Sequence, residues 1–202
     1  MKISHVFFDV GGVLGTNGWD HEQRATAATA FGLDPGDLNE RHDAVVAVWE
    51  MGGMSLEQYL DHTVFWRERP FTREEFRAFM LSQSRAFPET IAVARDLAAT
   101  GRYRLMTINN ESAELNTHRL QAFGLVDIFV TFFTSCWLGV LKPARQIFER
   151  ALVMSQAEPA AAVFVDDREP NLAAARLLGM HAILYHDAVR LRRDLAALTV
   201  AI

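Results

Sequence analysis

The chain has 202 residues, of which half are hydrophobic and 22% are charged, so it is long and apolar enough to bury one sizeable core. Its formal net charge of −5 argues against nucleic acid as a partner, because binding a phosphate backbone requires a basic face. Cys136 is its single cysteine, which excludes a disulfide within the chain and favours a reducing compartment.

The first apolar run, residues 3–8 (ISHVFF), predicts a buried strand that is closed by Asp9 and the pair Gly11-Gly12. This run is too short for a signal peptide, and Asp9 interrupts it. No apolar stretch approaches the roughly 18 residues of a membrane span. We therefore expect a soluble, cytoplasmic protein without a membrane partner.

Residues 15–86 carry helical signals and no strand signal. The pairs Asp20/Gln23 and Thr72/Glu75 resemble capping boxes, in which each side chain caps the other residue's backbone. Apolar residues recur at helical spacing between them. We expect about four helices, at residues 20–31, 37–49, 55–66 and from 72 onward. This pattern predicts a small all-helical domain inserted after the first strand.

From residue 88 the pattern alternates between helix and strand. Strands are predicted at residues 102–108, 127–134, 161–167 and 181–185. Helices are predicted at residues 88–101, 112–123, 143–154, 170–178 and 189–198. Such alternation predicts an α/β fold with a Rossmann-like parallel sheet flanked by helices. The core domain would then be discontinuous, formed by residues 1–14 and 87–202, with residues 15–86 as the helical cap domain.

Polar side chains gather at one edge of this predicted sheet, where ligands of such folds bind. They follow the carboxyl ends of four strands and are Asp9, Asn109, Asn110, Lys142, Asp166 and Asp167. Loop composition alone does not account for four clusters on the same edge. The sequence therefore predicts one active site there.

Asp9 and the pair Asp166-Asp167 supply hard oxygen ligands. An Asp at a strand end also caps turns, and one Asp of the pair can cap the following helix. A carboxylate after a buried strand is costly unless it is paired or binds a metal. Mg²⁺ prefers a small number of carboxylates together with water and phosphate oxygens. Neither His nor Cys accompanies these aspartates at the spacing of a zinc site.

Lys142 lies in the loop after the third of these strands, where it is either a solvated lysine or the partner of Asp9 and of an incoming phosphate. Asn109 and Asn110 are either turn residues or amide donors to phosphate oxygens beside a helix N-terminus. Asn171 is expected to orient the loop that carries Asp166.

The motifs FFDVGGVL, LMTINNES, GVLKP and FVDDREPN…LGM occur in this order, each on its expected element. Together with the helical insert, this set resembles the haloacid dehalogenase (HAD) superfamily over essentially the whole chain. The resemblance implies that Asp9 is a nucleophile that forms an aspartyl-phosphate. It implies Mg²⁺ held by Asp9, the backbone carbonyl of Gly11 and Asp167, with Asp166 close by. Lys142 would steady the nucleophile and the transferring phosphoryl group.

Two positions depart from the commonest HAD phosphatases. Gly11 stands where they have a second Asp, a general acid and base whose help is typically worth ~10²–10⁴ in rate. Asn109 stands where they have Ser or Thr, but its amide can still donate to a phosphate oxygen. The residues therefore support the presence of the site more strongly than they support hydrolysis of substrates with poor leaving groups.

Three functions agree with these residues. The first is a Mg²⁺-dependent phosphatase of a small phosphorylated metabolite. The second is a dehalogenase-type hydrolase in which Asp9 attacks carbon, although such enzymes need no metal. The third is a binding or regulatory protein that kept the fold and lost turnover through Gly11. We favour the first.

Overall fold

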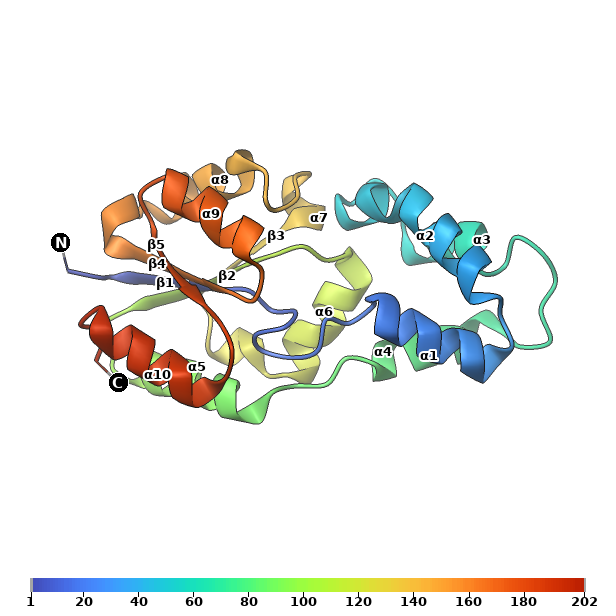
Figure 1. Cartoon of the computed structure of the whole chain (residues 1–202), viewed down its shortest axis with the longest axis horizontal. Coiled ribbons are helices and arrows are strands. Elements are labelled where there is room, and N and C mark those ends of the chain that lie inside the picture. Colours follow the sequence, from blue (N-terminus) through green and yellow to red (C-terminus); the bar gives the residue numbers. More distant parts are fainter. Residues whose placement is uncertain (1, 202) are drawn as a thin grey trace.

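The computed structural model describes residues 2–201, and within them a single parallel sheet has the strand order β3-β2-β1-β4-β5 (Figure 1). Its strands are β1 (His5–Phe8), β2 (Arg104–Asn109), β3 (Thr131–Thr134), β4 (Ala162–Asp166) and β5 (His181–Leu184). The chain order steps outward from β1 in both directions, so the strand ends beside β1 meet at the middle of one sheet edge. The predicted α/β architecture is confirmed.

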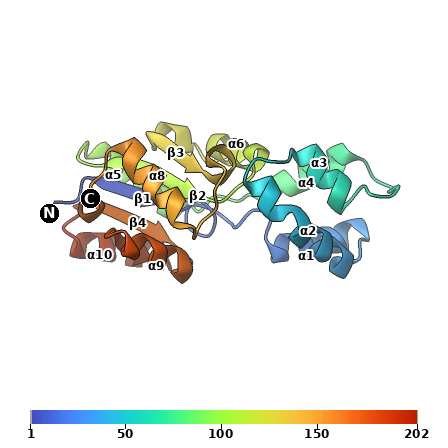
Figure 2. The same cartoon turned by 90° about the horizontal axis from the view of Figure 1, so that it is seen from above.

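Helices cover both faces of the sheet, as Figure 2 shows from above. Those of the core are α5 (Pro88–Ala99), α6 (Ala113–Ala122), α7 (Ser135–Leu138), α8 (Arg145–Ser155), α9 (Glu169–Leu177) and α10 (Ala188–Ala197), with the short 3-10 helices η1 (Leu125–Asp127) and η2 (Pro159–Ala161). None of the helices within residues 2–201 has the length and apolar character that crossing a membrane demands.

Two apolar layers sandwich the sheet, because alternate residues of a strand point to opposite faces. Val6 and Phe8 of β1 pack with α5, α6 and α10 on one face. Phe7 packs with α8 and α9 on the other. Strands buried on both faces are typical of parallel sheets and explain the uninterrupted apolar run of the sequence.

The remaining helices are α1 (His21–Phe31), α2 (Pro35–Glu50), α3 (Leu56–Thr63) and α4 (Arg73–Ser82), and they form a separate lobe beyond the carboxyl ends of the strands (Figure 1). Both expected capping boxes are present, at Asp20 and Thr72. The lobe has its own apolar cluster, which includes Trp49, Tyr59 and Phe76. We call α1–α4 the cap; the domain boundaries after residues 14 and 86 stay a prediction.

The two linkers between the cap and the sheet run side by side. Gly15 forms an antiparallel bridge with Ala86, and the Thr16 N–H donates to the Arg85 carbonyl at 2.8 Å. Arg119 of α6 donates through Nη2 to the Thr16 carbonyl at 2.7 Å and through Nε to Ser84 Oγ at 3.2 Å. One buried guanidinium thus ties both linkers to the core.

The element boundaries differ from the sequence-based ones mainly around β3. The predicted strand 127–134 is wrong over its first half, because Leu125–Asp127 form η1 and only Thr131–Thr134 pair with β2. Ile128 and Phe129 follow this helical turn and pack their apolar side chains in the core. An apolar pair of this kind is also typical of a buried strand, which explains the wrong prediction. The short helix α7 was not expected, and α8 begins at Arg145, two residues after Pro143.

Candidate active site

Asp9 and Asp166 lie next to each other because β1 and β4 are neighbouring parallel strands. Phe8 is in register with Val165, and the Asp9 N–H donates to the Val165 carbonyl at 2.8 Å. The two carboxylates therefore leave the same edge of the sheet. Asp9 is 7% exposed and Asp166 is fully buried, so both require partners.

Lys142 is the cationic partner of both carboxylates. Its Nζ lies 2.8 Å from Asp9 Oδ1 and 2.7 Å from Asp166 Oδ2. Asn110 positions the Lys142 loop through two hydrogen bonds: its Nδ2 donates to the Lys142 carbonyl at 2.9 Å, and its Oδ1 accepts from the Lys142 N–H at 2.7 Å. Lys142 is therefore a fixed charge and not a solvated surface lysine.

Asp166 is held from a second side by its own loop. Asn171 Nδ2 lies 3.0 Å from each Asp166 carboxylate oxygen, and the Arg168 N–H donates to Oδ1 at 2.8 Å. Asn171 thus takes the orienting position expected of it. With Lys142 added, the acceptor capacity of Asp166 is largely used within the protein.

Asp167 has the opposite character. Among residues 2–201, no hydrogen bond reaches its buried Oδ1. One oxygen each from Asp9, Asp166 and Asp167 lie within 4.8 Å of one another. A Cβ on Gly12, whose φ is +75°, would fall 2.2 Å from Asp167 Oδ2, so only glycine leaves space for this carboxylate. An unsatisfied oxygen in an all-carboxylate set fits a hard divalent cation such as Mg²⁺.

The site carries more negative charge than Lys142 neutralises. Burial raises the pKa of Asp9 to about 7, with Asp166 and Asp167 adding to the shift and Lys142 opposing it. Burial and Asp166 also raise the pKa of Asp167. Burial disfavours the charge of Lys142, but Asp9 and Asp166 outweigh it and raise the pKa of the ammonium. A bound cation favours ionised carboxylates and would lower the pKa of both Asp9 and Asp167.

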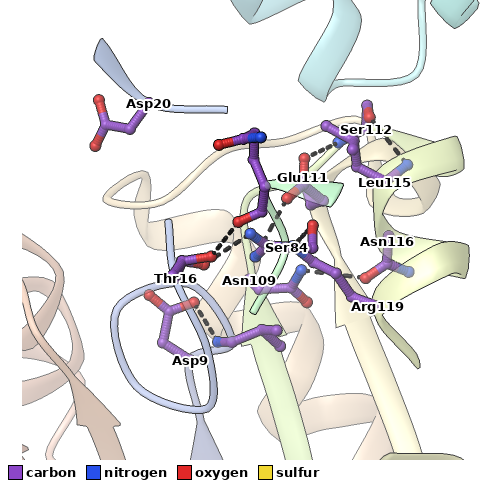
Figure 3. A network of polar contacts seen from close by, with 12 residues as sticks. Asp9, Thr16, Asp20, Ser84, Asn109, Glu111, Ser112, Leu115, Asn116 and Arg119 are labelled. Atoms are coloured by element: carbon purple, nitrogen blue, oxygen red, sulfur yellow. Dashed lines mark hydrogen bonds and ion pairs between the residues drawn. The ribbon is translucent and has the colours of Figure 1, made fainter. Parts of the chain in front are cut away.

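Asn109 does not line the cavity that holds Asp9, Asn110 and Lys142. Its Nδ2 donates to Asn116 Oδ1 at 3.2 Å, and its Oδ1 accepts from Thr134 Oγ1 at 3.1 Å. The amide therefore spans β2, β3 and α6 within the core, and Figure 3 shows its contact with Asn116. Its role in phosphate binding stays a prediction.

A cavity of about 330 Å³ separates the strand ends from the cap. Its core wall carries Asp9, Gly11, Asn110, Lys142 and Asn171, so the structure unites these predicted residues. Its cap wall includes Trp19, Arg24, His42, Trp49 and Glu50. Asp166 and Asp167 are not in its lining, and Asp167 lines two other hollows.

Arg119 and Glu111 also line this cavity, and the sequence did not single them out. Arg119 Nη1 lies 3.5 Å from Glu111 Oε2, and both side chains are buried (Figure 3). A Cβ on Gly11 would lie 3.6 Å from Arg119 Nη1, so the guanidinium borders the space where a second Asp side chain would begin. Arg119 comes four residues after the buried Leu115 on α6, and an arginine on an apolar helix face was the available signal.

Two aromatic residues of the cap wall are tied to each other through Tyr59. Its hydroxyl accepts from Trp19 Nε1 at 2.8 Å and bonds His42 Nδ1 at 2.8 Å. Burial lowers the pKa of His42 to about 4, which keeps the imidazole neutral near pH 7. Trp19 therefore both packs in the cap core and faces the cavity.

The chain is similar to several known proteins in sequence and in fold. Bifunctional epoxide hydrolase 2 of Sus scrofa is 27% identical over 231 residues, a match covering 98% of this chain and 39% of that protein. The chain thus spans well under half the length of the curated relatives it matches.

Among solved structures, a HAD family enzyme from Bacteroides thetaiotaomicron, in complex with magnesium and inorganic phosphate, superposes with a TM-score of 0.80 at 18% identity, covering 94% of this chain and 98% of that one. An L-2-haloacid dehalogenase gives 0.64 at 17% identity, covering 90% and 84%. At these identities the two structures share the fold with this chain. The family model of haloacid dehalogenase-like hydrolases matches residues 3–179, and the chain therefore belongs to that family.

Proposed function

We propose that the chain is a Mg²⁺-dependent phosphatase of a small phosphorylated metabolite, acting through an aspartyl-phosphate on Asp9. The observation that carries the proposal is the buried Lys142 ammonium, shared between Asp9 and Asp166, beside a third carboxylate with an unsatisfied oxygen. An attack on carbon makes no use of that third carboxylate. The likeness to a fold neighbour solved with magnesium and phosphate supports the same choice.

Mg²⁺ would be held by Asp9, Asp167 and the backbone carbonyl of Gly11, with Asp166 close by. When bound, such a cation supplies charge neutralisation for the phosphate oxygens and the carboxylates. The orphaned Oδ1 of Asp167 is the part of this set that nothing else among residues 2–201 satisfies.

Asp9 performs the covalent step. Both the Val10 N–H, at 2.8 Å, and Lys142 Nζ approach its Oδ1, and within residues 2–201 no hydrogen bond reaches Oδ2. The carboxylate attacks phosphorus, and the bond from phosphorus to the leaving oxygen breaks. Water then attacks the phosphorus of the aspartyl-phosphate, releasing inorganic phosphate and restoring Asp9.

Lys142 acts as a fixed electrostatic element. Because its loop is bonded to Asn110 and its ammonium is buried, it needs no reorganisation to meet the negative charge of the transferring group. Asn110 is thereby a positioning residue for Lys142, in addition to the phosphate-binding role that the sequence predicts for it.

The cavity size favours a small substrate. About 330 Å³ lies at the lower end of typical small-molecule sites, so the cavity admits a phosphorylated metabolite and not a folded protein. A cytoplasmic location stays a prediction.

The test is phosphate release from a panel of phosphorylated metabolites and from 4-nitrophenyl phosphate, with Mg²⁺ and with EDTA. We expect turnover that EDTA abolishes and that Asp9→Asn lacks. Circular dichroism of the variant shows whether it remains folded.

Each alternative has its own result. Phosphate release that persists in EDTA contradicts the metal-dependent mechanism. Chloride release from a 2-haloacid, without phosphate release, indicates the dehalogenase-type hydrolase. Mg²⁺ binding measured by calorimetry, without turnover across the panel, indicates the binding or regulatory protein.

A further inference from the structure

Glu50, the last residue of α2, is a cap carboxylate facing the same cavity as Asp9 and Gly11. The charged groups that influence it are Glu111 and Lys142 from the core, Arg168 from the loop after β4, and Asp20 from the entry to the cap. Within residues 2–201, no hydrogen bond or ion pair engages its carboxyl group. Glu50 is half-buried, and its carboxylate oxygens are not sealed from solvent, so they open onto the cavity where a substrate can reach them.

The backbone of Glu50 is fixed to the core at this point. Ser135 Oγ donates to the Glu50 carbonyl at 2.6 Å. Gly52 follows with φ +78°, and a Cβ there would fall 2.2 Å from the Cys136 carbonyl oxygen. No side chain fits between these backbones, so the end of α2 is seated against α7. The Glu50 side chain is therefore held over the cavity from a defined position.

The protonation of Glu50 suits proton transfer. Burial, aided by the negative charges of Glu111 and Asp20 and opposed by Arg168 and Lys142, raises the pKa of Glu50 to about 7. A group that titrates near the working pH can both give and take a proton.

Besides Asp9 and Glu50, three carboxylates line the cavity, and each is disfavoured: Asp43 is exposed, Asp20 caps α1 and pairs with Arg168 at 3.1 Å, and Glu111 is bonded within the core. The Glu111 carboxylate pairs with Arg119 at 3.5 Å and accepts from the Ser112 N–H at 3.0 Å. Burial raises the pKa of Glu111 and these two contacts oppose the shift, but they also hold its carboxyl group in place, so that it is not free to approach a leaving group as Glu50 is.

We propose that Glu50 of the cap is the proton donor to the leaving group, in the role that Gly11 cannot perform. This inference rests on the proposed phosphatase function. As Asp9 forms its bond to phosphorus and the leaving oxygen departs, the Glu50 carboxyl proton passes to that oxygen and leaves a carboxylate. In the second step this carboxylate takes a proton from the attacking water, while the water oxygen bonds to phosphorus. Glu50 is protonated again and the Asp9 carboxylate is restored.

The test compares two leaving groups in Glu50→Gln. Phenolate is a poor leaving group and 4-nitrophenolate a good one, so only the first depends strongly on a proton donor. We expect kcat/KM for phenyl phosphate to fall by ~10²-fold or more and kcat/KM for 4-nitrophenyl phosphate to change by only a few-fold. The ratio of kcat/KM values isolates leaving-group departure from later steps. Glu50→Asp should restore part of the loss.

Glu40→Gln is the matched control, because Glu40 lies on the same helix, is exposed and does not line the cavity. Equal losses on both substrates in Glu50→Gln, or no loss on either, overturn the proposal even though the variant remains folded by circular dichroism. If the wild-type chain releases no phosphate from either substrate, the phosphatase proposal itself fails, which is a distinct result.

Discussion

The two walls of the cavity differ in how their charged side chains are bonded. On the core wall, Lys142 is locked to Asp9 and to Asp166, which lies outside the cavity lining, and Asn110 and Asn171 fix the two partners in place. On the cap wall, Glu50 is held only through its main chain, and its carboxyl group is free to gain or lose a proton.

This difference separates two tasks of a hydrolase. The core wall offers charges that do not move, which is what stabilising a transferring phosphoryl group requires. The cap wall offers Glu50, whose carboxyl group has no hydrogen-bond or ion-pair partner within residues 2–201. Substitutions on the core wall should therefore cost more in both activity and stability than substitutions on the cap wall.

The largest effect is expected from Asp9→Asn. The amide keeps the shape of the side chain but removes the nucleophile, so phosphate release should fall by on the order of 10⁴-fold or more. Steady-state kinetics with Mg²⁺ measure this loss. A variant retaining a tenth of the wild-type rate would exclude Asp9 as the nucleophile.

Lys142→Met tests whether the core wall depends on its buried cation. Without the ammonium, Asp9 and Asp166 face each other unpaired, and breaking a buried pair in this way costs about 3–5 kcal/mol of unfolding free energy. Urea denaturation at pH 7 measures the change, with the exposed Lys2→Met as the control. A loss below about 1 kcal/mol would contradict a buried, paired lysine.

Asp167→Asn probes the proposed cation independently of turnover. The substitution removes a charge from the set of three carboxylates, and we expect Mg²⁺ to bind ~100-fold more weakly, equivalent to about 2.7 kcal/mol. Isothermal calorimetry gives the affinity, and the rise in melting temperature on adding Mg²⁺ gives a second measure. Unchanged affinity would remove Asp167 from the ligand set.

The smallest effect concerns Glu50 and pH. Because the pKa of Glu50 is raised from 4.5 to about 7 on folding, the native state binds more protons than the unfolded state between these values. The stability that comes from holding Glu50 in its protonated form is therefore fully present below about pH 4.5 and is lost as the pH rises to about 7. Urea denaturation should give Glu50→Gln a free energy of unfolding about 1–2 kcal/mol higher than that of wild type at pH 8. The two free energies should be equal at pH 4. If the free energy of unfolding changed with pH in the same way in the two proteins, Glu50 would have an ordinary pKa.

Features that depend on the order of elements could be predicted from the sequence. Asp9 directly follows β1 and Asp166 ends the neighbouring β4, so their proximity follows from the topology, whereas Lys142 comes after α7 and reaches them through a loop that Asn110 holds. The capping boxes at Asp20 and Thr72 are local and could be recognised for the same reason.

Features that depend on how helices pack against one another could not. Glu50 is one of several acidic residues on α2, and only the docking of α2 on α7 turns it toward the cavity. Asn109 lies at a strand end as expected, yet its amide points to Asn116 and Thr134, because neighbouring polar side chains compete for it. Strand position fixes where a residue lies but not which partner its side chain selects.

The paired linkers give the cap the character of an exchangeable module. Since Gly15 and Ala86 lie side by side, the chain leaves and re-enters the sheet at a single point, and the path of the core does not depend on what is inserted between them. Segments inserted at such adjacent ends are tolerated when the core folds independently. A different helical insert could therefore be grafted at this point to change substrate choice, provided that it again offers Arg119 a backbone carbonyl and a hydroxyl group.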